Sequence, residues 1–182
     1  MKLNKVLVTV ALLLIFSVSG CGSLEEAVQE AKKVVPGDWE VIHTEQVQNE
    51  ATIVFYINND ELGAGLFQKD AFGWKWLGTE GGSLVTYPKG LSWRYSDLGD
   101  KSAKFYLYYG FVEEPKISSI EVKTTWGEAV KATIVQSGEY SLWYAMISKA
   151  QVPSVDADIT GYSEKGDVLY LFSQPKQGTV TK

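Results

Sequence analysis

Short runs of apolar, aromatic and β-branched residues, separated by turn segments, recur along most of this chain. Side chains of these types favour strands, and turn signals every 8–12 residues or so are typical of sandwiches and barrels. The chain therefore has the pattern of a mainly β fold with antiparallel sheets, arranged as a sandwich or a barrel-like sheet. The expected strands cover residues 39–47, 51–57, 62–68, 72–77, 83–87, 91–95, 103–111, 117–125, 129–136, 140–148, 157–162 and 168–173.

Turn residues also suggest how the β-rich part, residues 38–173, is organised. Glu113-Glu114-Pro115 interrupts the strand pattern, and we expect two sub-structures to meet near residues 112–116. A turn is expected at residues 97–101. The strand at 103–111 has apolar side chains on both faces and is the predicted central strand. The polar residues 174–182 are expected to form a flexible tail.

One amphipathic helix is predicted at residues 23–35. Ser23 and Glu26 have the spacing of a capping box, and Pro36-Gly37 ends the pattern. Apolar residues recur at helical intervals and form one face. That face has two possible uses, which are to lie on a membrane surface or to pack on the β domain. Because the polar face is mixed rather than basic, packing on the domain is favoured.

The first twenty-one residues have the features of an export signal. Lys2 and Lys5 are the only charges, and an apolar run from Val6 to Val18 follows. This run is too short for a spanning helix. Its end, Val18-Ser19-Gly20-Cys21, resembles the lipobox of bacterial lipoproteins. The resemblance implies that residues 1–20 are a cleaved signal peptide, with cleavage between Gly20 and Cys21. It further implies lipid on the Cys21 thiol, acylation (for example by palmitate) of the new amino group, and a protein anchored on the extracytoplasmic face of the cell membrane.

The close of the β-rich part carries a second, shorter resemblance. Residues 159–170 are similar to the last hairpin of several small bacterial lipoproteins, which implies no particular activity. Residues 21–37 would then be the lipidated N-terminus with its helix.

Composition excludes several classes of function. The net charge is −5, and loss of the signal peptide removes two lysines, so the mature chain is more acidic still. Nucleic-acid binding through bulk charge is therefore not expected. Cys21 is the only cysteine, so lipidation leaves the folded part without thiols, and disulfides are excluded.

No catalytic or metal-binding pattern stands out. His43 is the only histidine, and it is expected to be a structural residue of a strand rather than a general base. With one histidine and no thiols, a zinc or copper site is improbable. The oxygen-rich stretches 58–61 and 156–158 lack the EF-hand spacing, and turn chemistry explains the first. We expect no cofactor and no metal.

Aromatic residues suggest one candidate binding surface. In an extended strand Trp74 and Trp76 share a face, and in a later strand Trp93 and Tyr95 do the same. If these strands were neighbours, the four rings would form a platform that stacks on sugars or apolar peptides. Alternatively the rings fill the core, which is the favoured interpretation.

These patterns predict a lipid-anchored module with an aromatic-rich β domain, which binds, assists or inhibits another component of the cell envelope. Its partners would be the membrane, through Cys21, and an envelope protein or glycan. The alternatives are a hydrolase that acts on envelope material through carboxylates brought together by the fold, and a structural envelope component.

Overall fold

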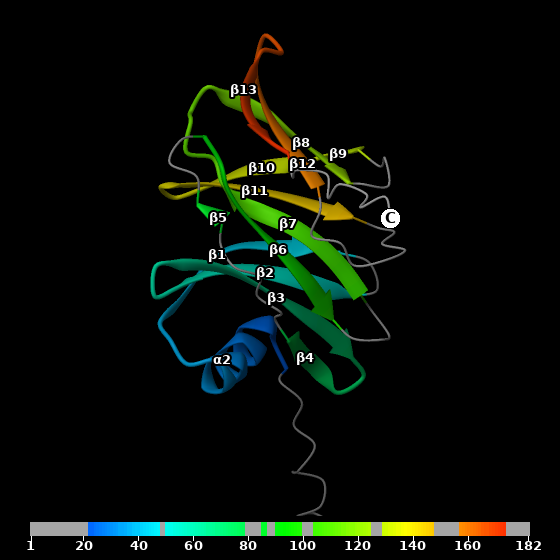
Figure 1. Ribbon diagram of the computed structural model, residues 1–182. Coiled ribbons are helices and arrows are strands. Elements are labelled where there is room, and N and C mark those ends of the chain that lie inside the picture. The colour runs from blue at the N-terminus through cyan, green and yellow to red at the C-terminus, as the bar shows by residue number, and fades with distance from the viewer. Residues whose placement is uncertain are drawn as a thin grey trace, which may run out of the picture. The chain divides into compact units, whose positions relative to one another are not determined.

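The computed structural model describes residues 22–47, 50–78, 85–86, 90–99, 104–124, 129–147 and 157–173. Over these residues the chain forms one helix and three antiparallel sheets (Figure 1). The expected fold class, mainly antiparallel β with one N-terminal helix, is confirmed. Residues 18–21 and the tail 174–182 lie outside the described part.

The chain divides into two compact units, which are treated separately below. The first comprises the described residues up to Glu61 together with Gly65–Gly78. The second comprises Leu62–Ala64 and the described residues after Gly78. Residues 112–116, where two sub-structures were expected to meet, lie within the second unit and link its two sheets.

The first unit contains the helix and a four-stranded antiparallel meander in the order β1-β2-β3-β4. Hydrogen bonds join each strand to the next one in the sequence. The bounds are α2 (Leu24–Val34), β1 (Trp39–Gln46), β2 (Ala51–Asn58), β3 (Glu61–Asp70) and β4 (Gly73–Gly78).

Helix α2 has the predicted start. The Ser23 hydroxyl accepts a hydrogen bond from the Glu26 amide, and the Glu26 carboxylate accepts one from the Ser23 amide, so the capping box is complete. The helix ends before Pro36 and Gly37. Gly37 has a φ of 151°, and a Cβ there would lie 1.7 Å from Asn58 Oδ1, so only glycine fits this exit from the helix.

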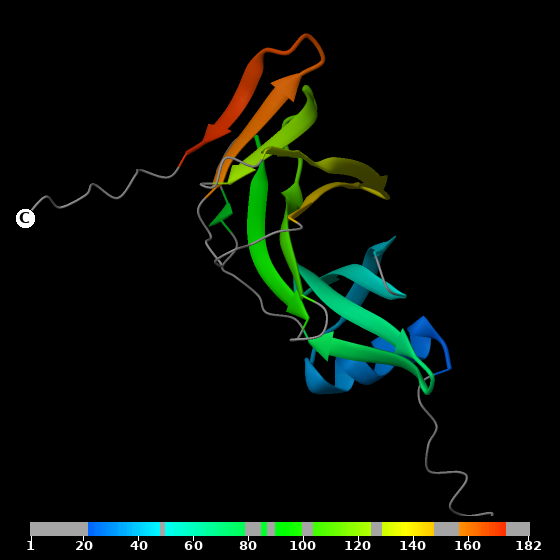
Figure 2. The same cartoon turned by 90° about the vertical axis from the view of Figure 1, so that its right-hand side faces the viewer.

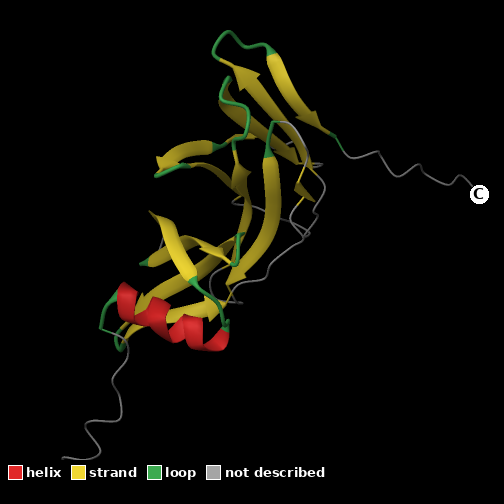
Figure 3. Cartoon of the chain, turned by 90° about the vertical axis from the view of Figure 1, so that its left-hand side faces the viewer, coloured by secondary structure: helices red, strands yellow, loops and turns green. Residues whose placement is uncertain are grey.

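The apolar face of α2 packs on the sheet of its own unit (Figure 3). Ala27, Val28 and Ala31 are buried in one cluster with residues of β1, β2 and β3. Trp39 completes this cluster, because its ring stacks on Tyr56 with a centroid distance of 3.8 Å. The apolar face of the helix thus packs on the β domain, which is one of the two uses considered for it.

The turn between β2 and β3 explains one acidic cluster of the sequence. Asn59 and Asp60 have φ values of 50° and 66°. Two successive positive φ angles are the signature of a tight hairpin turn, in which Asn and Asp are favoured. These residues therefore serve the turn, as expected.

The second unit contains two antiparallel sheets, with orders β10-β11-β7-β6-β5 and β13-β12-β8-β9. Residues from both sheets form one core cluster, so the unit is a sandwich (Figure 2). The bounds are β5 (Val85–Thr86), β6 (Ser92–Gly99), β7 (Lys104–Phe111), β8 (Ile117–Thr124), β9 (Ala129–Lys131), β10 (Thr133–Ser137), β11 (Tyr140–Ile147), β12 (Ala157–Ser163) and β13 (Val168–Phe172).

Strand β7 is the central strand of the five-stranded sheet, as predicted from its two apolar faces. Because Gly110 has no side chain, a residue of β11 can form a hydrogen bond across β7 to a residue of β6. The indole Nε1 of Trp143 on β11 donates a hydrogen bond of 3.0 Å to the carbonyl oxygen of Ser92 on β6. A Cβ at Gly110 would lie 1.9 Å from that same oxygen. Glycine is therefore required for this contact across the strand.

Two strand predictions were wrong in detail. The run at 129–136 forms two strands, because the chain changes sheets at Ala132: β9 pairs with β8, whereas β10 pairs with β11. Ala132 itself is buried and donates a hydrogen bond of 2.9 Å to the Ile120 carbonyl. The turn expected at 97–101 starts later, since β6 stays paired with β7 through Gly99.

Candidate functional site

Gly20 and Cys21, the predicted cleavage and lipidation residues, lie just before the described part of the chain. Gly22 and Ser23 are the first described residues, and both donate backbone hydrogen bonds to Oε2 of Glu26, at 2.7 and 3.3 Å. The start of α2 is thus fixed a few residues after Cys21. None of the helices in the described ranges has the length and apolar character needed to cross a membrane.

Two of the four residues predicted for an aromatic platform lie in the first unit. Trp74 and Trp76 are on β4, half-buried, and pack against the cluster that holds α2. Their rings face the helix side of the sheet. They contribute to the packing of α2 rather than to an open stacking surface.

The other two residues lie on β6 in the second unit. Trp93 is only 2% exposed and sits in the sandwich core, where its ring centroid is 4.9 Å from that of Phe172. Tyr95 packs against the same core. Because β4 and β6 belong to different sheets, they are not the neighbouring strands that the platform required. Both pairs of rings serve packing, which was the favoured interpretation.

His43 and the acidic clusters show no assembled chemistry in the described part. His43 Nε2 lies 3.7 Å from Glu45 Oε2, two residues along β1, and the imidazole stacks on Phe55. Asp158 accepts a hydrogen bond from the Ser173 hydroxyl at 2.5 Å. Over the described ranges, no three His, Cys, Asp or Glu side chains gather in a metal-binding arrangement.

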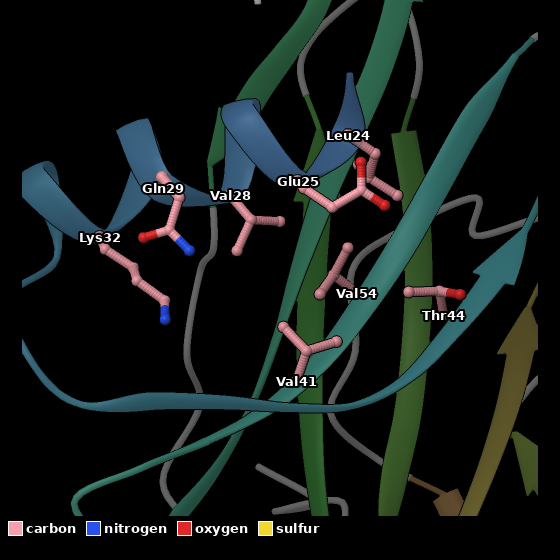
Figure 4. A pocket seen from close by; sticks show the side chains of 8 residues that line it. All are labelled: Leu24, Glu25, Val28, Gln29, Lys32, Val41, Thr44 and Val54. Atoms are coloured by element: carbon pink, nitrogen blue, oxygen red, sulfur yellow. The ribbon is translucent and has the colours of Figure 1, made fainter.

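A groove with a volume of about 180 Å³ lies between α2 and β1 in the first unit (Figure 4). Its floor and walls are mainly apolar. Val54 of β2 lies at the base, Val28 projects from the helix, and Val41 of β1 closes the opposite wall. The complete lining consists of Leu24, Glu25, Val28, Gln29, Lys32, Val41, Thr44 and Val54.

The groove exists because α2 does not cover the whole sheet. The helix packs against the β2, β3 and β4 side of the cluster, while β1 is the edge strand. Val41 is paired with Tyr56 and Thr44 with Val54, which places both on the helix side of the sheet. Val41 is still 43% exposed. An apolar side chain on this face therefore stays open to an occupant.

Two opposite charges mark the groove, seven residues apart on the helix. At one end, hydrogen bonds from its own backbone amide and from the Ser23 hydroxyl lower the pKa of Glu25, so this carboxylate stays ionised at neutral pH. At the other end, Lys32 Nζ donates a hydrogen bond of 2.9 Å to the Trp39 carbonyl oxygen. An ammonium has three donors, so Lys32 can bind an anionic group as well.

The groove can hold an apolar side chain with a cation at one end and an anion at the other. Sequence patterns missed it, because it depends on how far α2 extends over the sheet. No signal in the sequence marks the groove, because Val41 stands between Glu40 and Ile42 like any residue of a strand.

Comparison with models of protein families, with curated proteins and with solved structures found no match to this chain. The site is therefore interpreted from its own geometry.

Proposed function

We propose that this chain is a bacterial lipoprotein, anchored through acyl chains on Cys21 to the extracytoplasmic face of the cell membrane, whose β domain binds a partner in the cell envelope. The observation that carries the proposal is the stretch Val18–Cys21 at the end of a leader with a basic start and an apolar run. Lipid on both the thiol and the amino group of Cys21 would give stable anchoring, whereas one chain binds membranes only marginally.

The position of α2 supports a lipid anchor. The apolar face of the helix is occupied by the sheet of its own unit, so it is not the surface that holds a membrane. Leu24 is the third residue after Cys21, which limits the distance between their Cα atoms to about 10 Å. A lipid on Cys21 would therefore hold the first unit close to the membrane surface.

The groove beside α2 favours binding over the hydrolase and structural alternatives, because it is an open apolar site with charged ends. The packing of the aromatic residues favours a protein partner over a glycan. Sugar stacking needs exposed rings, whereas Trp93 is buried in one core and Trp74 and Trp76 are half-buried against the other.

The anchor is tested by fractionation of cells that produce the wild type or Cys21→Ala. We expect the wild type in the membrane fraction after alkaline washing, with a lipid mass on its N-terminal peptide, and Cys21→Ala as an unlipidated precursor. Gly22→Ala is the matched control, because a Cβ at Gly22 has room. A wild-type protein found wholly in the soluble fraction would contradict the anchor.

Binding is tested in intact cells with a photo-crosslinking residue in place of Thr44, an exposed residue of the groove lining. We expect an adduct with one envelope protein. The same crosslinker at Val34, which is 68% exposed on α2 but outside the groove, is the control and should give none. Hydrolysis of envelope glycans by the purified lipoprotein, without any adduct, would contradict the binding function.

A further inference from the structure

We infer that the groove between α2 and β1 binds an extended protein segment in which an apolar side chain lies between a basic and an acidic residue. This inference rests on the proposed function, because it specifies the partner of a binding module. The segment would place its apolar side chain over Val28, Val41 and Val54, its basic residue toward Glu25 and its acidic residue toward Lys32.

The apolar part of the argument comes from the lining. Val54 is fully buried at the base and Val28 nearly so, whereas Val41 on the edge strand is largely exposed. The groove volume of about 180 Å³ is comparable to that of an apolar cavity of about 150 Å³ that binds a benzene molecule. The groove therefore accommodates one large aliphatic side chain and not a drug-sized ligand.

The charges specify the spacing of the segment's side chains. Glu25 and Lys32 are seven residues apart on one helix, a separation of about 10 Å along its axis. In an extended segment, alternate side chains share a face, and residues i and i+4 are about 13 Å apart. The long side chains of Glu25 and Lys32 cover the difference. The pattern basic-x-apolar-x-acidic therefore matches the groove, and so does its reverse in a segment that runs the other way.

An acyl chain is the other apolar occupant within reach, since the groove begins close to Cys21. A lipid tail in the bilayer is already surrounded by hydrocarbon, so it gains little by moving into the groove. An apolar side chain in water gains the full transfer free energy. This difference favours the protein segment.

The probe is a displayed library of random nine-residue peptides, selected on the mature lipoprotein held in detergent micelles. We expect the enriched peptides to share the pattern basic-x-apolar-x-acidic in one of its two directions. Their affinity should fall about tenfold or more with Val41→Lys and stay unchanged with Val34→Lys, which adds the same charge outside the groove.

The charges are tested separately with Glu25→Gln and Lys32→Gln, because reversing either charge would oppose the helix dipole. Each variant should weaken binding several-fold and abolish the preference for only one of the two charged peptide positions. Circular dichroism checks that α2 stays folded. If both variants weaken the binding of charged and uncharged peptides equally, the predicted pairing of the peptide charges with Glu25 and Lys32 is wrong.

Two results would overturn the inference: no peptide is enriched, or the binding of enriched peptides is insensitive to Val41→Lys. Binding of a fluorescent fatty acid that Val41→Lys abolishes, with no peptide binding, would overturn it in favour of a lipid. Failure of the anchor would be seen in the fractionation experiment, as absence of the wild type from the membrane fraction. The inference and the proposed function can thus fail independently.

Discussion

Replacing Gly110 with alanine gives a direct test of the second unit. The added Cβ would lie 1.9 Å from the Ser92 carbonyl oxygen and 2.8 Å from Trp93 Cα, and both are backbone atoms that no rotamer change can move. Overpacking of this kind costs about 1–3 kcal/mol. The displaced carbonyl would also lose the hydrogen bond from Trp143 Nε1, worth about 1 kcal/mol. We therefore expect Gly110→Ala to lower the free energy of unfolding by about 2–4 kcal/mol.

Urea denaturation followed by tryptophan fluorescence measures this change. Gly138→Asn is the matched control in the same unit, because Gly138 has open space around it and Asn tolerates its φ of 57°. The control should change the free energy of unfolding by less than about 0.5 kcal/mol.

A double-mutant cycle with Trp143→Phe, which removes the indole donor, tests whether Gly110→Ala breaks the hydrogen bond between Trp143 and Ser92. If alanine at position 110 acts partly by breaking the bond between Trp143 and Ser92, the two losses should fall short of additivity by about 1 kcal/mol. Strict additivity, or a Gly110→Ala loss below about 0.5 kcal/mol, would refute this account of why the strand needs glycine.

Three further predictions concern other parts of the chain. Ser23→Ala removes the capping box and should cost about 1 kcal/mol in thermal unfolding; no change would mean that the cap does not stabilise α2. Lys75 pairs with Asp70 and lowers the pKa of that carboxyl, so its stabilising effect is present above the carboxyl's unfolded pKa and lost as the pH falls through the folded pKa. An NMR titration should show this pKa rising in Lys75→Gln, and an unchanged value would contradict the assignment. Trp93→Ala should cost about 3–5 kcal/mol in urea denaturation, and a loss below about 1 kcal/mol would show that the ring is not a core residue.

Local patterns predicted most of the fold. The capping residues set the start of α2, and Asn59-Asp60 set a tight turn whose backbone angles few other residues adopt. The two apolar faces of residues 104–111 predicted a central strand, because only such a strand is covered on both sides. Each of these signals acts within a few residues and is legible without tertiary structure.

The sheet memberships and the groove were not predictable in this way. Trp74 and Trp93 have similar local sequences, yet they lie in different sheets, because strand pairing depends on contacts between residues far apart in the chain. The groove follows from how much of its sheet α2 covers. No local pattern encodes that extent, and the exposure of Val41 is known only from the structure.

The change of sheets at Ala132 links the two layers of the sandwich in register. Residues 129–131 pair with β8, and residues 133–137 pair with β11. One continuous stretch of chain therefore fixes the alignment of both sheets, with a single buried alanine between them. Strands β9 and β10 are edge strands, so deleting or inserting one residue here would shift the pairing of one of them by one step and turn its side chains to the other face. Ala132 therefore couples the register of β9 in one layer to the register of β10 in the other.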